Sequence, residues 1–176
     1  MSRHELDQLI LDEAAEDARS AVWEFDSARI WLDEARQRPM EPLAAEVWVT
    51  DPGAKYIVLV KHRVRGWVPP GGEVERYETP RQGAARELLE ETGLRVELHA
   101  EPAAVTVRSY RPDLSPTLGL SYTATVERDA PLVGEQGQPA AWFDLDTEWD
   151  SVFPEDRERI RAHARRLTAG RRPGSS

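Results

Sequence analysis

The pattern of hydrophobic and polar residues divides the chain into a helical beginning, a middle region of short strands and a helical end. From His4 to about Gln37 the chain has neither glycine nor proline, and Leu6, Ile10 and Ala14 recur at the spacing of one helix face. We therefore expect two short helices that end before Pro39.

A strand pattern follows Pro42. Small and β-branched residues alternate with polar or aromatic ones from Ala45 to Thr50, which is the period of a half-buried strand. A turn over Asp51 to Gly53 leads to a return strand at Tyr56 to Val60, and a loop is expected from Arg63 to Gly72. Further strands are expected at Leu94 to Leu98, Ala104 to Tyr110, Leu118 to Val126 and Ala140 to Leu145.

Two more helices are expected, one among the strands and one after them. The first runs from about Pro80 to Thr92, with Thr79 as its N-cap and Gly93 as its C-cap. The second has Pro154 in its first turn. Five or more strands with helices among and around them predict an α+β fold, with layers on both sides of a mixed sheet.

Length and composition fit one globular domain, since the chain has 176 residues, of which 40% are hydrophobic and 31% charged. The lack of cysteine excludes disulfide scaffolds, cysteine nucleophiles and thiolate zinc sites. The net charge of −9 disfavours a nucleic-acid partner. The acidic N-terminus and the absence of a long apolar run indicate neither a signal peptide nor a membrane partner, so we expect a cytoplasmic protein.

Three carboxylates carry the clearest chemical signal. Glu87, Glu90 and Glu91 fall at positions i, i+3 and i+4 of the expected helix and therefore share one face. Repulsion among them favours a compensating cation, and Mg²⁺ or Mn²⁺ prefers such oxygen ligands together with substrate phosphates. The alternative is an acidic helix end that only faces water.

The residues around these carboxylates extend the pattern. Arg86 can hold a carboxylate bidentately, Glu78 lies near the helix start, and Gly71 and Gly72 permit a sharp turn close to a ligand. The full spacing is Gly72, five residues, Glu78, seven residues, and then RELLEETGL from Arg86 to Leu94. This spacing matches the Nudix box without a departure, and the preceding segment WVPPGG also resembles the Nudix hydrolase family.

The resemblance implies a Nudix fold, an α/β/α sandwich with a mixed β-sheet, over residues 42–170. Residues 1–41 would be an N-terminal helical extension, and residues 171–176 a disordered tail. Because Trp23 and Trp31 give the extension an apolar face that has to be buried, these helices are a candidate homodimer interface.

The resemblance also implies a pyrophosphohydrolase that uses Mg²⁺ or Mn²⁺ to hydrolyse a nucleoside diphosphate linked to another group. Glu90 and Glu91 would be the principal metal ligands, and Glu87 a further ligand or the base that activates water. Arg86 would orient these glutamates, and Glu78 would assist the metal shell.

Two segments after the box suggest how a nucleotide would be bound. Gly134 to Asp146 resembles the loop that carries an extra metal-facing glutamate in the nucleoside triphosphate branch of the family, which makes Glu135 a candidate ligand beside Gly71. The segment around Pro154 resembles the base pocket of the 8-oxo-purine triphosphatases, although a plain helix start is the alternative. The candidate substrate contacts are Gly72, Glu78, Arg108, Phe153, Glu155 and Asp156.

We therefore expect a small-molecule nucleotide as substrate, most simply a nucleoside triphosphate cleaved to the monophosphate and pyrophosphate. The proline-rich loop from Ser109 to Gly119 favours an alternative, an ADP-ribose or nucleotide-sugar pyrophosphatase. A second alternative is a non-catalytic nucleotide-binding module on the same fold, which would be expected to have lost glutamates that this sequence retains.

Overall fold

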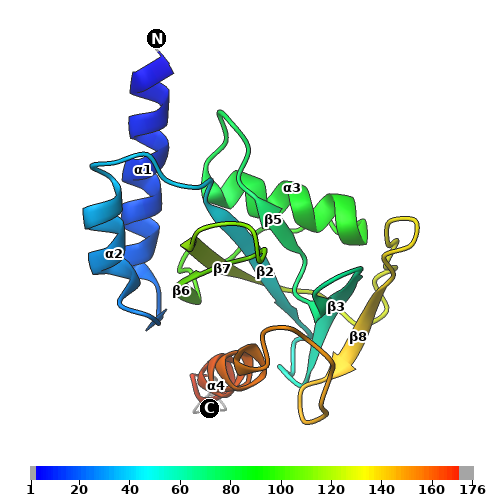
Figure 1. The fold of residues 1–176 in the computed structure, drawn as a ribbon. Helices are drawn as coiled ribbons and strands as arrows, with labels where there is room; N and C mark the ends of the chain where they lie inside the picture. The colour runs from blue at the N-terminus through cyan, green and yellow to red at the C-terminus, as the bar shows by residue number, and fades with distance from the viewer. Residues whose placement is uncertain (1–2, 171–176) are drawn as a thin grey trace.

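A mixed β-sheet forms the middle layer of the structure, and helices cover both of its faces (Figure 1). The computed structural model describes residues 3–170, so the predicted tail at 171–176 lies outside the described residues. The helices are α1 (Arg3–Ser20), α2 (Ala28–Ala35), α3 (Pro80–Thr92) and α4 (Glu155–Ala169). The strands are β1 (Trp23–Glu24), β2 (Ala44–Thr50), β3 (Tyr56–His62), β4 (Gly66–Val68), β5 (Gly71–Glu73), β6 (Ala104–Arg108), β7 (Thr117–Thr125) and β8 (Ala140–Asp144). The predicted α+β class and the helical N-terminal region are confirmed.

The sheet branches at β2. This strand pairs in parallel with β7 along its whole length, from Ala44 opposite Gly119 to Thr50 opposite Thr125. On the other edge of β2, β5 pairs with its beginning, whereas β3 meets its end, where Thr50 lies opposite Ile57. β3 then continues away from β2 and pairs with β4 and β8. The middle of β2 is therefore left between two branches of the sheet.

Two clusters of buried side chains hold the layers together. On one face, Leu88 of α3 belongs to a cluster with Val47 of β2, and the helices α1 and α2 contribute to the same cluster. On the other face, Ile160 and Ala164 of α4 belong to a cluster with Trp48. Adjacent residues of β2 thus face opposite layers, as their alternation in the sequence predicts.

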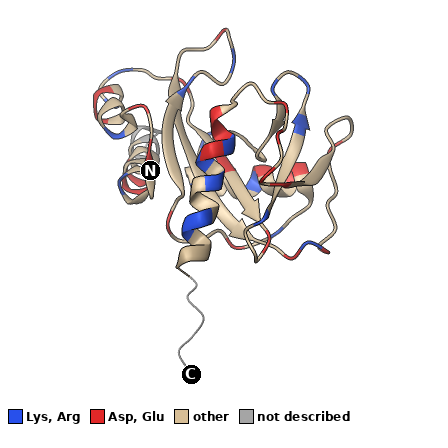
Figure 2. Ribbon diagram, turned by 90° about the horizontal axis from the view of Figure 1, so that it is seen from below, with Lys and Arg blue, Asp and Glu red and all other residues tan. Residues whose placement is uncertain are grey.

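Helix α4 carries acidic residues at its start and basic residues further along (Figure 2). Glu155, Asp156 and Glu158 lie in the first turn and Arg166 in the last, which is the favourable order for the helix dipole. Pro154 precedes the helix at the N-cap position, one residue before the expected first turn.

The N-terminal helices pack on the rest of the chain. The short strand β1, which the sequence pattern does not predict, joins them to the sheet by pairing in parallel with β6. Trp23 and Phe25 pack against the cluster on the α4 side, and Trp31 packs against the cluster on the α3 side. These aromatic side chains thus bury surface within one chain, and a homodimer through them stays a prediction. No helix within residues 3–170 is both long and apolar enough to cross a membrane.

The segment Leu94 to Leu98 forms no strand, contrary to expectation. Its alternating apolar side chains pack on the cluster on the α3 side, so the alternation reflects core packing rather than a strand ladder. The backbone meets the sheet just after this segment, where the N–H of His99 donates to the carbonyl of Thr123 at 2.8 Å. The guanidinium of Arg81 donates to the carbonyl of His99 at 2.8 Å.

Two short strands, β4 and β5, interrupt the loop that was expected from Arg63 to Gly72. The prolines Pro69 and Pro70 separate the strands but do not prevent them. β5 lies very close to β2, because a Cβ on Gly71 would be 2.5 Å from the carbonyl oxygen of Ala45. Glycine at this position therefore permits the pairing, which the sequence pattern of the loop concealed.

Candidate active site

The helix that carries the three carboxylates is fixed at both ends, as the sequence predicts. Thr79 and Gln82 form a reciprocal capping box, and Pro80 occupies the first turn. At the other end Gly93 adopts a left-handed conformation with φ 72°, and its N–H donates to the carbonyl of Leu89. These caps hold α3 beside β5.

Arg86 lies at the centre of the acidic cluster. Its guanidinium nitrogens lie 2.7 Å from Glu78, 2.7 Å from Glu87 and 3.2 Å from Glu90, and one of them donates to the carbonyl oxygen of Glu73 at 3.0 Å. Although burial opposes it, the hydrogen bond from Arg86 lowers the pKa of the Glu78 carboxyl. The same hydrogen bond raises the pKa of Arg86. One guanidinium thus fixes the positions of several glutamates.

Two glycines of β5 contact two glutamates of α3. The N–H of Gly71 donates to Oε2 of Glu91 at 2.8 Å. A Cβ on Gly72 would be 2.6 Å from Oε1 of Glu87, so this glutamate occupies the space that any larger residue would need. Glu91 is buried, with 9% of its surface exposed. The glycine pair therefore forms the contact surface between the strand and the carboxylates.

Negative charge accumulates at this contact. Burial raises the pKa of Glu91 to about 7, the Gly71 N–H opposes the rise, and the charges of Glu87 and Glu135 add to it. Burial also raises the pKa of Glu87, with Arg86 opposing and the charges of Glu90 and Glu135 adding. Glu135 is exposed and lies in the turn before β8, where Gln138 donates to it at 3.3 Å. Glu135 is therefore close enough for its charge to act on Glu87 and Glu91.

The donor set fits a hard divalent cation, although no three acidic or histidine side chains within residues 3–170 converge as a ready metal cage. Arg86 is the cation that contacts Glu87 and Glu90 in this structure. The available ligands are carboxylate oxygens with mutual repulsion, which Mg²⁺ or Mn²⁺ binds through few protein ligands and several water or phosphate oxygens. The residues present therefore suit such an ion.

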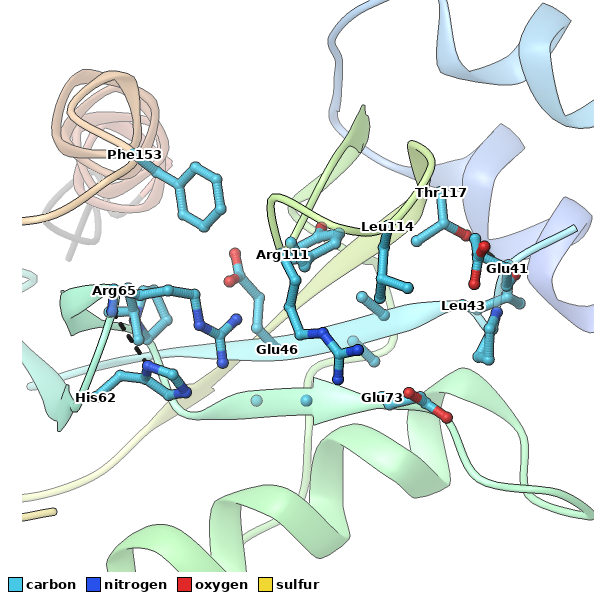
Figure 3. A pocket seen from close by; sticks show the side chains of 18 of the residues that line it. Glu41, Leu43, Glu46, His62, Arg65, Glu73, Arg111, Leu114, Thr117 and Phe153 are labelled. Atoms are coloured by element: carbon cyan, nitrogen blue, oxygen red, sulfur yellow. Dashed lines mark hydrogen bonds between the residues drawn. The ribbon is translucent and has the colours of Figure 1, made fainter. Parts of the chain in front are cut away.

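A cavity of about 230 Å³ lies on the other side of the glycine pair (Figure 3). Its walls come from β2, β4, β5 and the loop from Ser109 to Gly119. Its lining includes Glu41, Leu43, Glu46, His62, Arg65, Val68, Pro69, Gly71, Gly72, Glu73, Tyr110, Arg111, Leu114, Thr117 and Phe153. Gly71 and Gly72 thus contact the carboxylates and line the cavity as well.

Phe153 is the one predicted base-pocket residue that lines the cavity itself, among the described residues. Its ring lies 4.3 Å from the guanidinium carbon of Arg108. Behind the ring, Arg108 forms two hydrogen bonds to Asp156, at 3.0 and 2.8 Å. Glu155 lies at 3.8 Å from Arg108 and is more exposed. The four predicted residues are therefore neighbours. Arg108 and Asp156, however, form an ion pair with each other and do not line the cavity.

Two residues with a direct place in the cavity were not predicted from the sequence as site residues. Glu46 projects into it from β2, and Arg65 projects into it from the segment between β3 and β4 (Figure 3). The charge of Arg65 also lowers the pKa of Glu91, so this lining residue acts electrostatically on the carboxylates as well. An acidic residue in a strand of alanine, valine and tryptophan was the signal that could have identified Glu46. Arg65 belongs to the basic run from Lys61 to Arg65, and a basic run in a loop usually faces solvent, so the sequence gives no comparable signal for it.

Comparison with known proteins adds a family and a fold. The family model for the NUDIX domain matches residues 40–166. A MutT-like protein of Streptomyces ambofaciens is 35% identical over 65 residues, which are 37% of this chain and 42% of that protein. This match therefore spans less than half the length of that relative.

Solved structures of similar fold cover most of the chain. A MutT NUDIX hydrolase from Burkholderia pseudomallei has a TM-score of 0.56 at 20% identity, covering 68% of this chain and 95% of that chain. A NUDIX family hydrolase from Clostridium perfringens has a TM-score of 0.54 at 17% identity, covering 73% and 97%. An Ap4A hydrolase from C. elegans has a TM-score of 0.53 at 20% identity, covering 74% and 98%. At these identities the matches show the fold, which is the predicted one.

Proposed function

Because this chain belongs to the NUDIX domain family, we propose that it hydrolyses a phosphoric anhydride bond in a small nucleotide, with a divalent cation as cofactor. The substrate class is a nucleoside diphosphate linked to another group. Within that class we propose a nucleoside triphosphate, oxidised purine triphosphates included, cleaved to nucleoside monophosphate and pyrophosphate.

The position of the glycine pair carries this proposal. Gly71 and Gly72 line the cavity on one side and contact Glu91 and Glu87 on the other. A nucleotide whose base enters the cavity would therefore have its phosphates beside the carboxylate cluster. A plain acidic helix end facing water would have no such cavity on the far side of its contacts.

The carboxylates have the chemistry to hold the cation. In our proposal Glu87, Glu90 and Glu91, with Glu135 and the backbone of Gly71, would bind Mg²⁺. When bound, the ion would neutralise charge on phosphate oxygens and lower the pKa of a water ligand.

The protein groups around the ion would position the substrate and move the proton. Glu87, whose pKa is raised by burial, is suited to take a proton from the attacking water. Arg86 would keep the glutamates oriented through the ion pairs described above. Arg65 lines the cavity and its charge acts on Glu91, so its guanidinium would contact a phosphate of the bound nucleotide. Glu78 would act through Arg86 rather than on the substrate.

The nucleoside end would lie deeper in the cavity. Phe153 offers an aromatic face, and Leu43, Val68 and Leu114 supply apolar contacts. The hydroxyl of Tyr110 lies against Gly119 of β7, in the space that a Cβ on Gly119 would occupy. Arg108, Glu155 and Asp156 would support Phe153 from behind.

Product identification tests the proposal. The protein is incubated with Mg²⁺ and a panel of nucleoside triphosphates, oxidised triphosphates, nucleotide sugars and dinucleoside polyphosphates. We expect monophosphate and pyrophosphate from a triphosphate, and no turnover in excess chelator. Turnover confined to nucleotide sugars would instead support the second candidate, which the loop lining the cavity at Tyr110, Arg111 and Leu114 favours. Binding without turnover of any compound would support a non-catalytic module.

A further inference from the structure

We propose that Glu46 selects the nucleobase, by accepting hydrogen bonds from a base edge that presents neighbouring N–H groups. This inference rests on the proposed function, because it assumes that the cavity holds the base of a nucleotide. It assigns the polar part of recognition to a residue of β2, on the wall of the cavity that faces Phe153 (Figure 3).

The carboxyl of Glu46 is held from one side. The indole N–H of Trp48 donates to its Oε1 at 2.8 Å, and the hydroxyl of Ser121 donates to the same oxygen at 2.7 Å. In the described part of the chain these are the hydrogen bonds of the carboxyl, so Oε2 is left for a ligand. Both donors come from buried residues, which fixes the direction in which the carboxyl points.

The local charge favours an N–H donor as the ligand group. Arg108 is the neighbouring cation, but its two hydrogen bonds go to Asp156. The same guanidinium also lies 3.8 Å from Glu155, and burial together with the charge of Asp156 raises the pKa of the Glu46 carboxyl. Within the described residues no cation pairs directly with the Glu46 carboxylate, so its charged form lacks a stabilising ion-pair partner. A ligand N–H directed at Oε2 would supply the missing complement, and a hydrogen bond to a charged acceptor is among the stronger ones.

This acceptor distinguishes between bases. Guanine presents its ring N1–H next to its amino group, so two neighbouring donors can meet the two lone pairs of Oε2. Adenine presents one amino group next to the lone pair of N1, which would be repelled by the same acceptor. A buried polar group that is left unpaired by the wrong ligand gives strong discrimination, whereas the apolar contacts of Phe153 and Leu114 do not distinguish these purines.

The variant Glu46→Gln tests the inference sharply. Trp48 can only donate its indole N–H, so the amide of the new side chain must turn its oxygen toward Trp48 and its NH₂ toward the cavity. An acceptor is thereby replaced by a donor of the same size and direction. We expect the wild-type chain to bind GMP at least tenfold more tightly than AMP, and the variant to lose or reverse that preference.

The measurement is isothermal titration with GMP and AMP in the absence of divalent metal, so that it does not depend on hydrolysis. Glu97→Gln makes the same chemical change on an exposed side chain away from the cavity and should leave the ratio of the two affinities unchanged. Glu46→Met, which is apolar and of similar length, should bring the two affinities together and serves if the glutamine variant fails to fold.

Each outcome separates the two claims. A ratio of affinities that is the same in wild type, Glu46→Gln and Glu46→Met would overturn the role of Glu46, even if triphosphates are hydrolysed. A wild-type preference for AMP would overturn the acceptor role as well. A ratio that shifts as expected while no nucleotide in the panel is hydrolysed would support base selection by Glu46 and contradict the proposed hydrolysis.

Discussion

The backbone N–H of Gly71 donates a hydrogen bond of 2.8 Å to Oε2 of Glu91. This bond joins the wall of the cavity to the helix that carries the carboxylates. A neutral side chain of the same length can also accept this hydrogen bond. The contact with Gly71 therefore does not require the negative charge that we propose for binding the cation.

The variant Glu91→Gln should therefore keep the fold and lose activity. Its amide oxygen can still accept the hydrogen bond from the Gly71 N–H. Burial raises the pKa of the Glu91 carboxyl to about 7, which means that the buried charge is unfavourable. Removing this charge should therefore not lower the free energy of unfolding near pH 8. Loss of a cation ligand should lower kcat by about a hundredfold or more. Steady-state kinetics and denaturant unfolding measure the two effects, with Glu97→Gln as the exposed control. Near-normal turnover in Glu91→Gln would remove Glu91 from the metal site.

Alanine at Gly71 and alanine at Gly72 should have different effects. At Gly71 the added Cβ would meet backbone, 2.5 Å from the carbonyl oxygen of Ala45 and 2.6 Å from the Cα of Glu46. Since strands β2 and β5 would have to move apart, we expect a loss of about 1–3 kcal/mol in the free energy of unfolding. At Gly72 the added Cβ would meet the end of the flexible Glu87 side chain.

For Gly72→Ala we therefore expect stability close to wild type and a clear loss of turnover, because Glu87 would be displaced from its place in the cluster. Thermal unfolding and kcat are measured on both variants, each serving as the control for the other. If Gly72→Ala is fully active, the observed position of Glu87 is not required for catalysis.

Much of the fold could be predicted because local signals agreed with tertiary structure. Helix α3 was predicted to the residue, since Thr79, Pro80 and Gly93 are strong terminal signals that need no distant partner. The strand predicted at Leu94 to Leu98 failed because alternation reports only that one side of a segment is buried. Alternation does not say whether the backbone pairs with another strand. Here β7 pairs with β2 on one edge and with β6 on the other.

The candidate site could be predicted only where its residues are close in sequence. Arg86 and its glutamates lie on one helix, so their spacing already determines that they meet. Glu46 and Phe153 come from distant parts of the chain and face each other across the cavity only after the sheet has branched and α4 has packed. Asp156 was predicted as a substrate contact, but its bidentate pairing with Arg108 depends on a partner 48 residues away.

The ion pair between Arg108 and Asp156 should be important for stability. Both side chains are largely buried, with 13% and 5% of their surfaces exposed. Replacing Arg108 with methionine would leave a buried carboxylate without its partner, so we expect a loss of about 3–5 kcal/mol in the free energy of unfolding. Arg111→Ala, which breaks an exposed ion pair with Asp113, should leave the free energy of unfolding close to that of wild type.

A double replacement separates the loss of the pair from a general packing defect. With Arg108→Met combined with Asp156→Leu neither member of the pair is left without its partner, so most of the lost stability should return. Denaturant unfolding of the two single variants and the double variant gives the coupling between the sites. A double variant that is less stable than Arg108→Met would show that the pair contributes through its shape rather than its charge.

His163 should make the stability of the protein depend on pH. The ring lies at the interface of α4 with the sheet, and its centroid is 5.8 Å from the centroid of the Trp48 ring. Within the described residues neither ring nitrogen has a hydrogen-bond partner, so no group stabilises an imidazolium there. Burial, with the charge of Arg166 adding to it, lowers the pKa of His163 to about 4.

The direction of the pH effect follows from proton uptake. In the unfolded chain His163 takes up a proton below about pH 6.5, whereas in the folded chain it stays neutral until about pH 4. The unfolded state therefore binds more protons in this window, and the free energy of unfolding should fall as the pH falls through it. Glu91, whose pKa is raised, contributes in the opposite direction, so wild type alone does not isolate the histidine.

The difference between wild type and His163→Leu isolates it, because the carboxylates contribute equally to both proteins. Near pH 8 the histidine is neutral in both states, so the difference there measures packing alone. Below pH 6.5 the leucine variant should gain relative to wild type, by on the order of 2 kcal/mol at pH 4. Urea unfolding at a series of pH values measures the difference. If it is constant from pH 8 to pH 4, the folded protein accepts a proton on His163 as readily as the unfolded chain does, and the buried ring must then have a partner that stabilises its charge.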